Sequence, residues 1–122
     1  MASWCVFIRV VFDTHSSLFV RVSVHKKIIA FIGIRVVGSD AHITNIAVIP
    51  TYQNKGLGKQ LLAEAEMFAR QHGCQTMSLE VRISNSGAQR LYTTFGYTTR
   101  QVLTEYYSEG NEDALDMVKQ LK

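Results

Sequence analysis

Cysteine and proline are nearly absent from this chain. It has two cysteines, Cys5 and Cys74, and one proline among 122 residues. The cysteines lie far apart, and the four histidines show no spacing typical of metal ligands, so the sequence predicts a reduced protein without a metal. A chain of this length can bury a hydrophobic core without disulfides. We therefore expect residues 1–122 to form a single domain.

The chain also lacks the features that direct proteins to membranes or to nucleic acid. The apolar segment 4–12 is interrupted by Arg9, is followed by Asp13, and is too short to span a membrane and unlike a signal peptide. The formal net charge is +3, but lysine and arginine never form a run of five or more. We expect a cytoplasmic protein whose anionic partner is a phosphate-bearing small ligand, with no direct role for nucleic acid or membrane.

Hydrophobic patterning predicts a mixed α/β protein of the α+β type, with antiparallel strands at its front. Residues 17–24 alternate in polarity, 28–37 are rich in β-branched side chains, and 41–49 end at Pro50, so each is predicted as a strand. The first apolar segment, 4–12, is ambiguous. Its valine and isoleucine content favours a strand, but its apolar residues fall at helical spacing, and we predict a short helix.

After Pro50 the pattern becomes helical. Apolar residues from Leu57 to Ala69 share one face and are followed by Gly73, which is typical of a helix end. Residues 76–83 alternate in polarity again and predict a half-polar strand. A second helix, capped by Ser84 or Asn85 and ended by Gly96, and two closing strands, 97–107 and 113–121, joined by a polar loop, complete the prediction.

Glycine is concentrated between the third strand and the first long helix, in the sequence QNKGLGKQLL (53–62). The unpaired N–H groups of a helix start, together with the helix dipole, attract anions, and two glycines leave the backbone uncovered there. The loop is neither a Walker motif, because Gln53 and Gln60 replace required residues, nor a dinucleotide fingerprint, because Leu61 replaces the third glycine. The residues alone leave a plain turn equally open.

Two further residues are candidates for proton transfer, although each also has an ordinary structural explanation. Glu80 lies on the polar face of its predicted strand, where a solvated carboxylate is common. Tyr92 lies at helical spacing with Ala88 and Phe95, where a tyrosine buried in a core is common.

In combination, these segments resemble the GNAT family of N-acetyltransferases, and within it the ribosomal-protein-alanine N-acetyltransferases of the RimI type. The match runs in order through TNIAV, YQNKGLGKQLL, LEVRISN, AQRLYTTFGY and YYSEGNEDALDM, and covers roughly residues 17–122. The glycine loop is shared by the whole superfamily, whereas LEVRISN followed by the LY and the double tyrosine is more specific.

The resemblance implies an acetyltransferase whose co-substrate is acetyl-CoA. The family strand that corresponds to NIAV splays from its neighbour and pairs with the pantetheine arm, which assigns Ile46, Ala47 and Val48 to acetyl-CoA, with a backbone N–H polarising the thioester carbonyl. Asn85 matches an asparagine that contacts the same arm. The pyrophosphate loop of the family corresponds, after Gln53, to Asn54, Lys55, Gly56, Leu57, Gly58 and Lys59.

The resemblance also implies the chemistry and the acceptor. Glu80 matches the general base and Tyr92 the general acid, which would protonate the departing thiolate. A base is needed because a peptide α-amine has a pKa of about 7.7–8.0 and arrives largely protonated. The expected acceptor is a protein N-terminus, with the N-terminal alanine of a small-subunit ribosomal protein as the leading candidate. By position, Glu105, Tyr106, Tyr107 and Glu112 are candidate contacts to it.

The chain departs from the family at its N-terminus. The resemblance implies a first strand and a first helix ahead of the region where this chain starts, and we expect the chain to be shortened there. We therefore expect an incomplete acceptor groove and an uncovered apolar face that favours a homodimer, with Phe12, Leu18, Phe19 and Phe31 as candidates for that face. Two alternatives stay open: an acetyltransferase for lysine side chains or small amines, and a CoA-binding module that has lost turnover.

Overall fold

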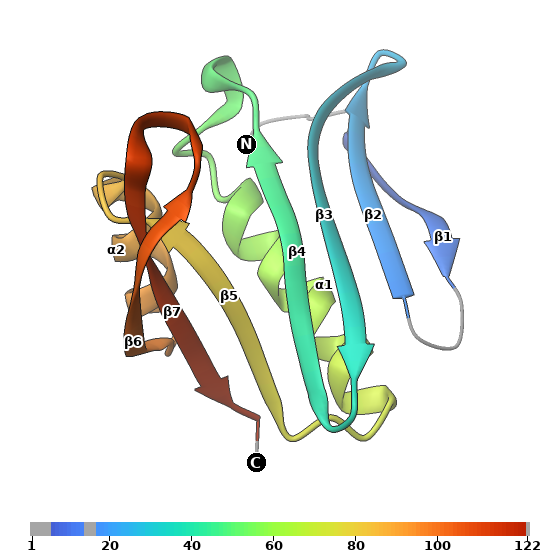
Figure 1. Ribbon diagram of the computed structural model, residues 1–122. Coiled ribbons are helices and arrows are strands. Elements are labelled where there is room, and N and C mark those ends of the chain that lie inside the picture. Colours follow the sequence, from blue (N-terminus) through green and yellow to red (C-terminus); the bar gives the residue numbers. More distant parts are fainter. Residues whose placement is uncertain (1–5, 14–16, 122) are drawn as a thin grey trace.

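One seven-stranded sheet organises the molecule. The structure, a computed structural model, describes the backbone of residues 6–13 and 17–121 and the side chains of 17–121. The strand order is β1-β2-β3-β4-β5-β7-β6 (Figure 1). The bounds are β1 Val6–Asp13, β2 Ser17–Val24, β3 Lys27–Val37, β4 Asp40–Val48, β5 Thr76–Arg82, β6 Thr98–Tyr107 and β7 Glu112–Gln120. Neighbouring strands are antiparallel except β4 and β5, which are parallel.

Two α-helices lie against one face of this sheet. Helix α1 (Leu57–Gln71) packs on β2, β3 and β4, and helix α2 (Ser86–Thr94) lies beside its first turn, where Gly58 and Leu91 meet. Two short 3₁₀ turns, η1 (Pro50–Tyr52) and η2 (Glu109–Asn111), complete the chain. The exposed face of the sheet is therefore the face opposite α1 (Figure 1).

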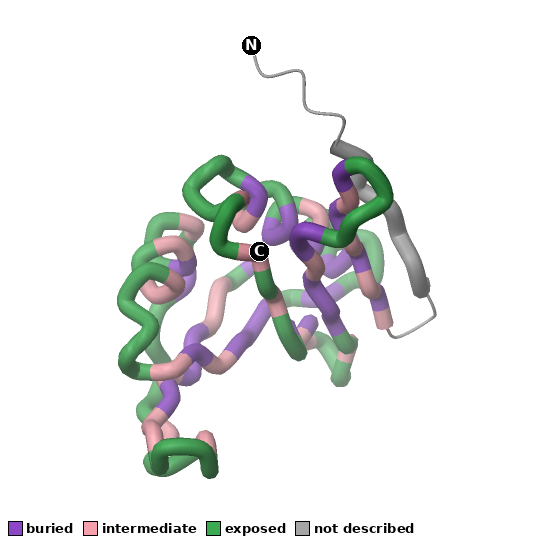
Figure 2. The backbone as a smooth tube through the Cα atoms, turned by 90° about the horizontal axis from the view of Figure 1, so that it is seen from above, coloured by how far each residue is buried: buried purple, intermediate pink, exposed green. Residues whose placement is uncertain are grey.

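The hydrophobic core lies between the sheet and α1. Alternate residues of β2, among them Val20 and Val22, are fully buried, and they face Leu61 and Leu62 from the apolar stripe of the helix. Each such side chain contributes about 1.5–3 kcal/mol on burial. Figure 2 shows the buried residues in the strands and along α1, with exposed residues in the connecting loops.

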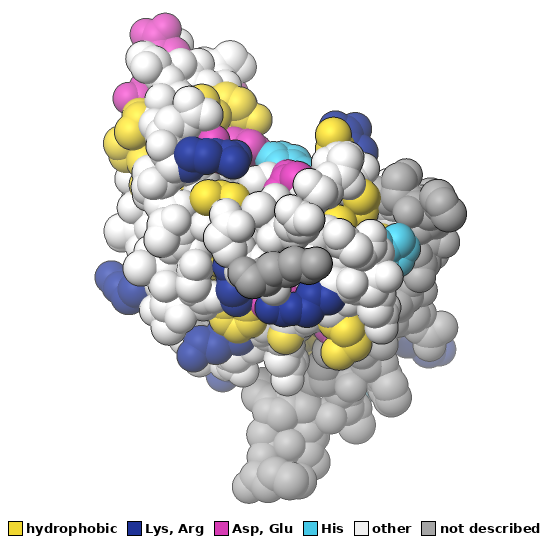
Figure 3. Space-filling model, turned by 90° about the horizontal axis from the view of Figure 1, so that it is seen from below, with side chains coloured by type: hydrophobic (Ala, Val, Ile, Leu, Met, Phe, Trp, Pro, Cys, Tyr) yellow, Lys and Arg dark blue, Asp and Glu magenta, His cyan; other side chains and the backbone are white. Residues whose placement is uncertain are grey.

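The α+β prediction is confirmed, and the predicted strands and helices from residue 17 onward are present within a few residues of their expected bounds. Ile83, the last residue of the strand predicted over 76–83, lies beyond Arg82 and is exposed, because β5 ends one residue earlier. None of the helices in the described part of the chain combines the length and apolarity needed to cross a bilayer. Figure 3 shows lysine and arginine interspersed with acidic, apolar and uncharged groups at one end of the molecule.

The predicted first helix is wrong. Residues 6–13 form strand β1, which pairs antiparallel with β2 from Val6 opposite Val24 to Asp13 opposite Leu18. The β-branched content of this segment and the open edge of β2 outweigh the helical spacing of its apolar residues. Trp4 and Cys5 lie outside the described residues, as does the side chain of Phe12.

Leu18 was also placed on the wrong face. It is buried in the core, because in a strand every second residue shares a face and Leu18 follows the alternation of Val20 and Val22. Phe19 and Phe31 lie on the opposite, partly exposed face, with ring centroids 5.7 Å apart. Of the side chains expected on the uncovered face, Phe19 and Phe31 are therefore the two that lie there among those the structure describes.

Candidate active site

The parallel strands β4 and β5 separate soon after they meet. They pair only where Asp40–His42 lie opposite Thr76–Ser78. Beyond this point β4 stays paired with β3 as far as Val48, while β5 stays paired with β7 as far as Arg82. Within the described part of the chain, their facing edges therefore carry backbone N–H and C=O groups with no partner strand, and Figure 1 shows the two strands diverging toward their C-terminal ends.

A β-bulge in β4 shapes one wall of this opening. The register with β3 shifts so that Ile43 lies opposite Ile34 and Asn45 opposite Gly33, which leaves Thr44 as the extra residue. A Cβ on Gly33 would lie 2.8 Å from both Thr44 Oγ1 and Asn45 Oδ1. Glycine at this position therefore makes room for the bulge.

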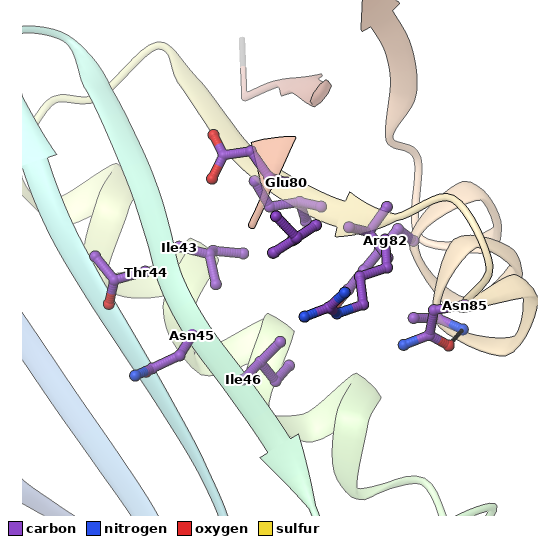
Figure 4. Close-up of a pocket in the computed structure, with 12 residues that line it drawn as sticks. Ile43, Thr44, Asn45, Ile46, Glu80, Arg82 and Asn85 are labelled. Carbon is purple, nitrogen blue, oxygen red and sulfur yellow. Dashed lines mark hydrogen bonds between the residues drawn. The ribbon is translucent and has the colours of Figure 1, made fainter. Parts of the chain in front are cut away.

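A cavity of about 270 Å³ lies between the separated strands. It brings together Ile46 of β4, Glu80 of β5, and Asn85 and Tyr92 of α2 and its cap, four residues that the family resemblance assigns to one site (Figure 4). Ala47 and Val48 continue the same strand but do not line the cavity. The complete lining consists of Ile43, Thr44, Asn45, Ile46, Leu79, Glu80, Val81, Arg82, Asn85, Ala88, Tyr92 and Tyr107.

The Glu80 carboxylate is held in a polar environment at the cavity wall. Its Oε1 lies 3.1 Å from His42 Nε2 and accepts a hydrogen bond of 3.4 Å from the Tyr106 hydroxyl. Its side chain is 20% exposed, so it remains within reach of a molecule in the cavity. This arrangement suits a carboxylate that exchanges a proton with a bound acceptor.

Tyr92 is suited to donate a proton. Burial, followed by the influence of Tyr107, raises the pKa of Tyr92 to about 12. Its phenol therefore stays protonated throughout the physiological range. Because it lines the same cavity as Glu80, the site contains one group that can take a proton and another that can give one.

Asn85 has a structural role in addition to the expected contact. Its Oδ1 accepts a hydrogen bond of 3.1 Å from Ala88 N–H, which makes it the N-cap of α2. The cap uses the carbonyl end of the amide and leaves the NH₂ end able to donate. The predicted cap at Ser84 or Asn85 is thereby confirmed for Asn85.

Two of the predicted acceptor contacts, Tyr107 and Glu112, lie against Arg82, whereas Tyr106 contacts Glu80. The Arg82 guanidinium lies 4.1 Å from the centroid of the Tyr107 ring, and its Nη1 bonds Glu112 Oε1 at 3.1 Å. Glu112 also accepts a hydrogen bond from Ser84 N–H, and these contacts hold the pKa of its carboxyl below the usual value. Glu105 is exposed, and its N–H bonds Asp113.

The glycine loop opens the N-terminal end of α1. The Gln53 side chain donates to Val48 C=O at 2.9 Å and ties the loop to the end of β4. Gly56 is the N-cap, in the left-handed conformation at φ 84°, and offers no capping side chain. The first helical hydrogen bond is Gln60 N–H to Gly56 C=O, so the N–H groups of Leu57, Gly58 and Lys59 precede the helical ladder. Among the residues that the structure describes, nothing lies within 4 Å of a Cβ built on Gly56, so an anion can approach this helix end.

Sequence reasoning missed His42 and Arg82. Arg82 lies two residues beyond Glu80 on the same strand and therefore on the same face, a signal that was available. His42 is 38 positions from Glu80, and the two meet because of the short parallel pairing of β4 with β5. Strand register is needed to bring them together.

Comparisons with known proteins show the family to which the chain belongs. A family model described as "Acetyltransferase (GNAT) family" matches residues 2–97. The chain is 40% identical over 93 residues to a [ribosomal protein bS18]-alanine N-acetyltransferase of Escherichia coli K12, and 40% identical over 96 residues to the protein of that name from Haemophilus influenzae. These matches cover 75% and 76% of this chain. The chain spans 63% and 65% of the lengths of these relatives.

Solved structures share the same fold. The crystal structure of the ribosomal-protein-S18-alanine N-acetyltransferase from Escherichia coli superposes with a TM-score of 0.80 at 34% identity, covering 90% of this chain and 72% of that one. A GNAT family acetyltransferase from Elizabethkingia anophelis, solved with acetyl-CoA bound, also gives 0.80, covering 94% of this chain and 97% of that one. At 17% identity the second likeness concerns the fold alone.

Proposed function

Because the chain belongs to the GNAT family of acetyltransferases, we propose that it transfers the acetyl group of acetyl-CoA to the N-terminal α-amine of a protein. The proposed acceptor is the N-terminal alanine of the small-subunit ribosomal protein bS18, the acceptor named for the relatives from Escherichia coli and Haemophilus influenzae. The observation that carries the proposal is the cavity between β4 and β5, which places a carboxylate and a protonated phenol beside an unpaired strand edge.

The residues present fit acetyl-CoA. The free edge of β4 at Ile46, Ala47 and Val48 offers backbone groups to the amides of the pantetheine arm, and the Asn85 amide lies across the cavity from it. The bare helix start at residues 54–59 suits the pyrophosphate. Bound there, acetyl-CoA supplies an activated acyl group as a thioester.

The side chains of the cavity divide the proton transfers between them. Glu80 would remove a proton from the acceptor ammonium, directly or through a water, so that the amine can attack the thioester carbonyl. Tyr92, held protonated by burial, would give its proton to the leaving thiolate. A direct attack of this kind needs no covalent acetyl-enzyme. Cys74 is buried, and burial raises its thiol pKa, which does not favour a nucleophile.

A panel of peptides tests the acceptor. Incubation with acetyl-CoA should acetylate a peptide with the bS18 N-terminal alanine at its α-amine, and mass spectrometry with fragmentation locates the added acetyl group. Matched peptides that begin with serine or methionine, and one with a blocked N-terminus and an internal lysine, complete the panel. Acetylation confined to the internal lysine would refute the N-terminal assignment, and a complete lack of acetylation would leave a CoA-binding module.

A pair of glycine substitutions tests the anion site. Gly56 and Gly38 both have positive φ values, 84° and 62°, and neither has any atom within 4 Å of a built Cβ. Alanine at either position should therefore cost a similar amount of stability, about 1–2 kcal/mol. Gly56→Ala alone places a methyl group over the start of α1 and should weaken acetyl-CoA binding about tenfold, or about 1.4 kcal/mol.

Titration calorimetry measures the affinity of each variant for acetyl-CoA. Thermal melts of the unliganded variants measure the loss of stability that we expect to be similar in both. If the Gly38 variant loses as much affinity as the Gly56 variant, the effect comes from general destabilisation. If neither loses affinity, the pyrophosphate does not bind at this loop.

A further inference from the structure

A line of polar side chains runs along the face of the sheet opposite α1, from the start of β4 to the candidate base. Asp40 accepts hydrogen bonds from Thr76 Oγ1 at 2.8 Å and from Ser78 Oγ at 2.6 Å. Ser78 Oγ lies 3.0 Å from His42 Nδ1, and His42 Nε2 lies 3.1 Å from Glu80 Oε1. The line therefore connects a carboxylate outside the cavity to Glu80, through one imidazole.

The direction of the hydrogen bonds follows from counting protons. Ser78 has one hydroxyl proton, and the Asp40 carboxylate can only accept, so that proton is donated to Asp40. Ser78 Oγ must then accept from His42, which places a proton on Nδ1. The other ring nitrogen, Nε2, is then the one that faces Glu80 Oε1, at 3.1 Å.

Burial gives this line its rigidity. Ser78 is only 3% exposed, and the His42 side chain is 27% exposed, so its Nδ1 end is anchored where water competes little. The phenol of Tyr106 donates to the same Oε1 of Glu80 that faces His42. Within the described residues, His42 and Tyr106 thus both contact Glu80 through Oε1, and these two contacts orient its carboxylate.

We propose that His42 is a positioning residue for Glu80: anchored by Ser78 and Asp40, it holds Oε1 and thereby directs Oε2 to the acceptor amine. This inference rests on the proposed function, since it assigns Glu80 the role of base. The proton removed from the ammonium is taken by Glu80 Oε2, while Oε1 stays in contact with His42 Nε2 and the Tyr106 hydroxyl. A fixed carboxylate matters because a misplacement of about 1 Å can cost a hundredfold in rate.

A double-mutant cycle tests whether His42 acts through Glu80. His42→Ala should lower kcat on the order of ten- to a hundredfold with an unchanged KM for acetyl-CoA. His42→Gln, whose amide can still donate to Oε1, should retain activity within a few-fold. In a Glu80→Gln background, adding His42→Ala should cost less than about twofold, because the group being positioned is already gone.

Two outcomes would overturn the inference. If the His42→Ala and Glu80→Gln losses multiply in the double variant, His42 acts independently of Glu80. If His42→Ala leaves kcat unchanged, no positioning is needed. If the wild-type protein acetylates none of the peptides, the proposed function itself is refuted, and this outcome is distinct from the two above.

A spectroscopic measurement examines the contact without turnover. In the intact protein, Glu80→Gln and Ser78→Ala should each shift the ring ¹⁵N resonances of His42, whereas Glu109→Gln, a remote change, should not. Ring resonances that are unmoved by Glu80→Gln would show that the imidazole and the carboxylate are not in contact, and the inference would fail even if acetylation is observed.

Discussion

Glu80→Gln should lower kcat for peptide acetylation by about 10²–10⁴-fold near neutral pH, the usual contribution of a positioned general base. The amide keeps the shape of the side chain but cannot take the proton of the acceptor ammonium. The site that we assign to acetyl-CoA is built from other residues, so affinity for acetyl-CoA should be unchanged. Steady-state kinetics with mass-spectrometric detection measure the rate, and calorimetry measures the affinity.

The pH dependence gives this result a second signature. A peptide α-amine has a pKa of about 7.7–8.0, so the fraction that arrives already deprotonated grows as the pH rises through 8. The ratio of the wild-type kcat to the kcat of Glu80→Gln should therefore fall between pH 7 and pH 9. A ratio that is constant over this range would mean that Glu80 does not act by removing the ammonium proton.

Glu66→Gln is the matched control. Glu66 is also a partly desolvated carboxylate with cationic partners, at 2.7 Å from Lys119 and 3.2 Å from Arg70, but it lies on α1 and does not line the cavity. Its replacement should lower stability and leave kcat unchanged at temperatures below the melting transition. Equal losses of kcat in the two variants would remove Glu80 from the role of base.

The fold was predictable because its strands and helices have different hydrophobic periods. In β2 every second residue is buried, in β5 the apolar residues Met77, Leu79 and Val81 are buried at the same spacing, and in α1 the buried residues recur at helical spacing, so local sequence and tertiary packing agree. At residues 6–13 they disagree. There the spacing favoured a helix, and pairing with the exposed edge of β2, which no local pattern contains, gave a strand instead.

The candidate site was predictable where a single segment determines it. The open start of α1 follows from Gly56 and its neighbours, and the cap at Asn85 follows from its place before α2. The contact of His42 with Glu80 has a different origin. It depends on three residue pairs between β4 and β5, and a shift of one residue would turn His42 to the other face.

The bulge at Thr44 explains why the alternation of side chains along β4 does not predict which of its residues line the cavity. Strict alternation puts Ile43 and Ile46 of β4 on opposite faces, yet Ile43 belongs to the buried core and Ile46 packs against that core. The extra residue opposite Gly33 changes the phase of the strand between them. The sequence contains the glycine that permits the bulge, but which residue bulges depends on the partner strand.

Tyr92→Phe should lower kcat by about 10²–10⁴-fold, because it removes the proton that we assign to the leaving thiolate. Burial holds the pKa of Tyr92 near 12, above its usual value of 10, so the phenol is protonated at any pH at which the protein would work. The wild-type rate should therefore show no loss from tyrosine ionisation below about pH 11. Initial rates from pH 6 to 10 with both proteins measure this.

Tyr97→Phe provides the control for packing. Tyr97 is also a buried tyrosine whose pKa is raised by burial, its ring lies 6.0 Å from that of Tyr92, and its hydroxyl donates to Met77 Sδ at 3.6 Å. It does not line the cavity. Loss of its hydroxyl should alter stability by about 1 kcal/mol and leave kcat within twofold. If both substitutions slow acetylation equally, both tyrosines act by supporting the core and neither is the general acid. If only Tyr92→Phe slows acetylation, the proton is donated by Tyr92, which lines the cavity.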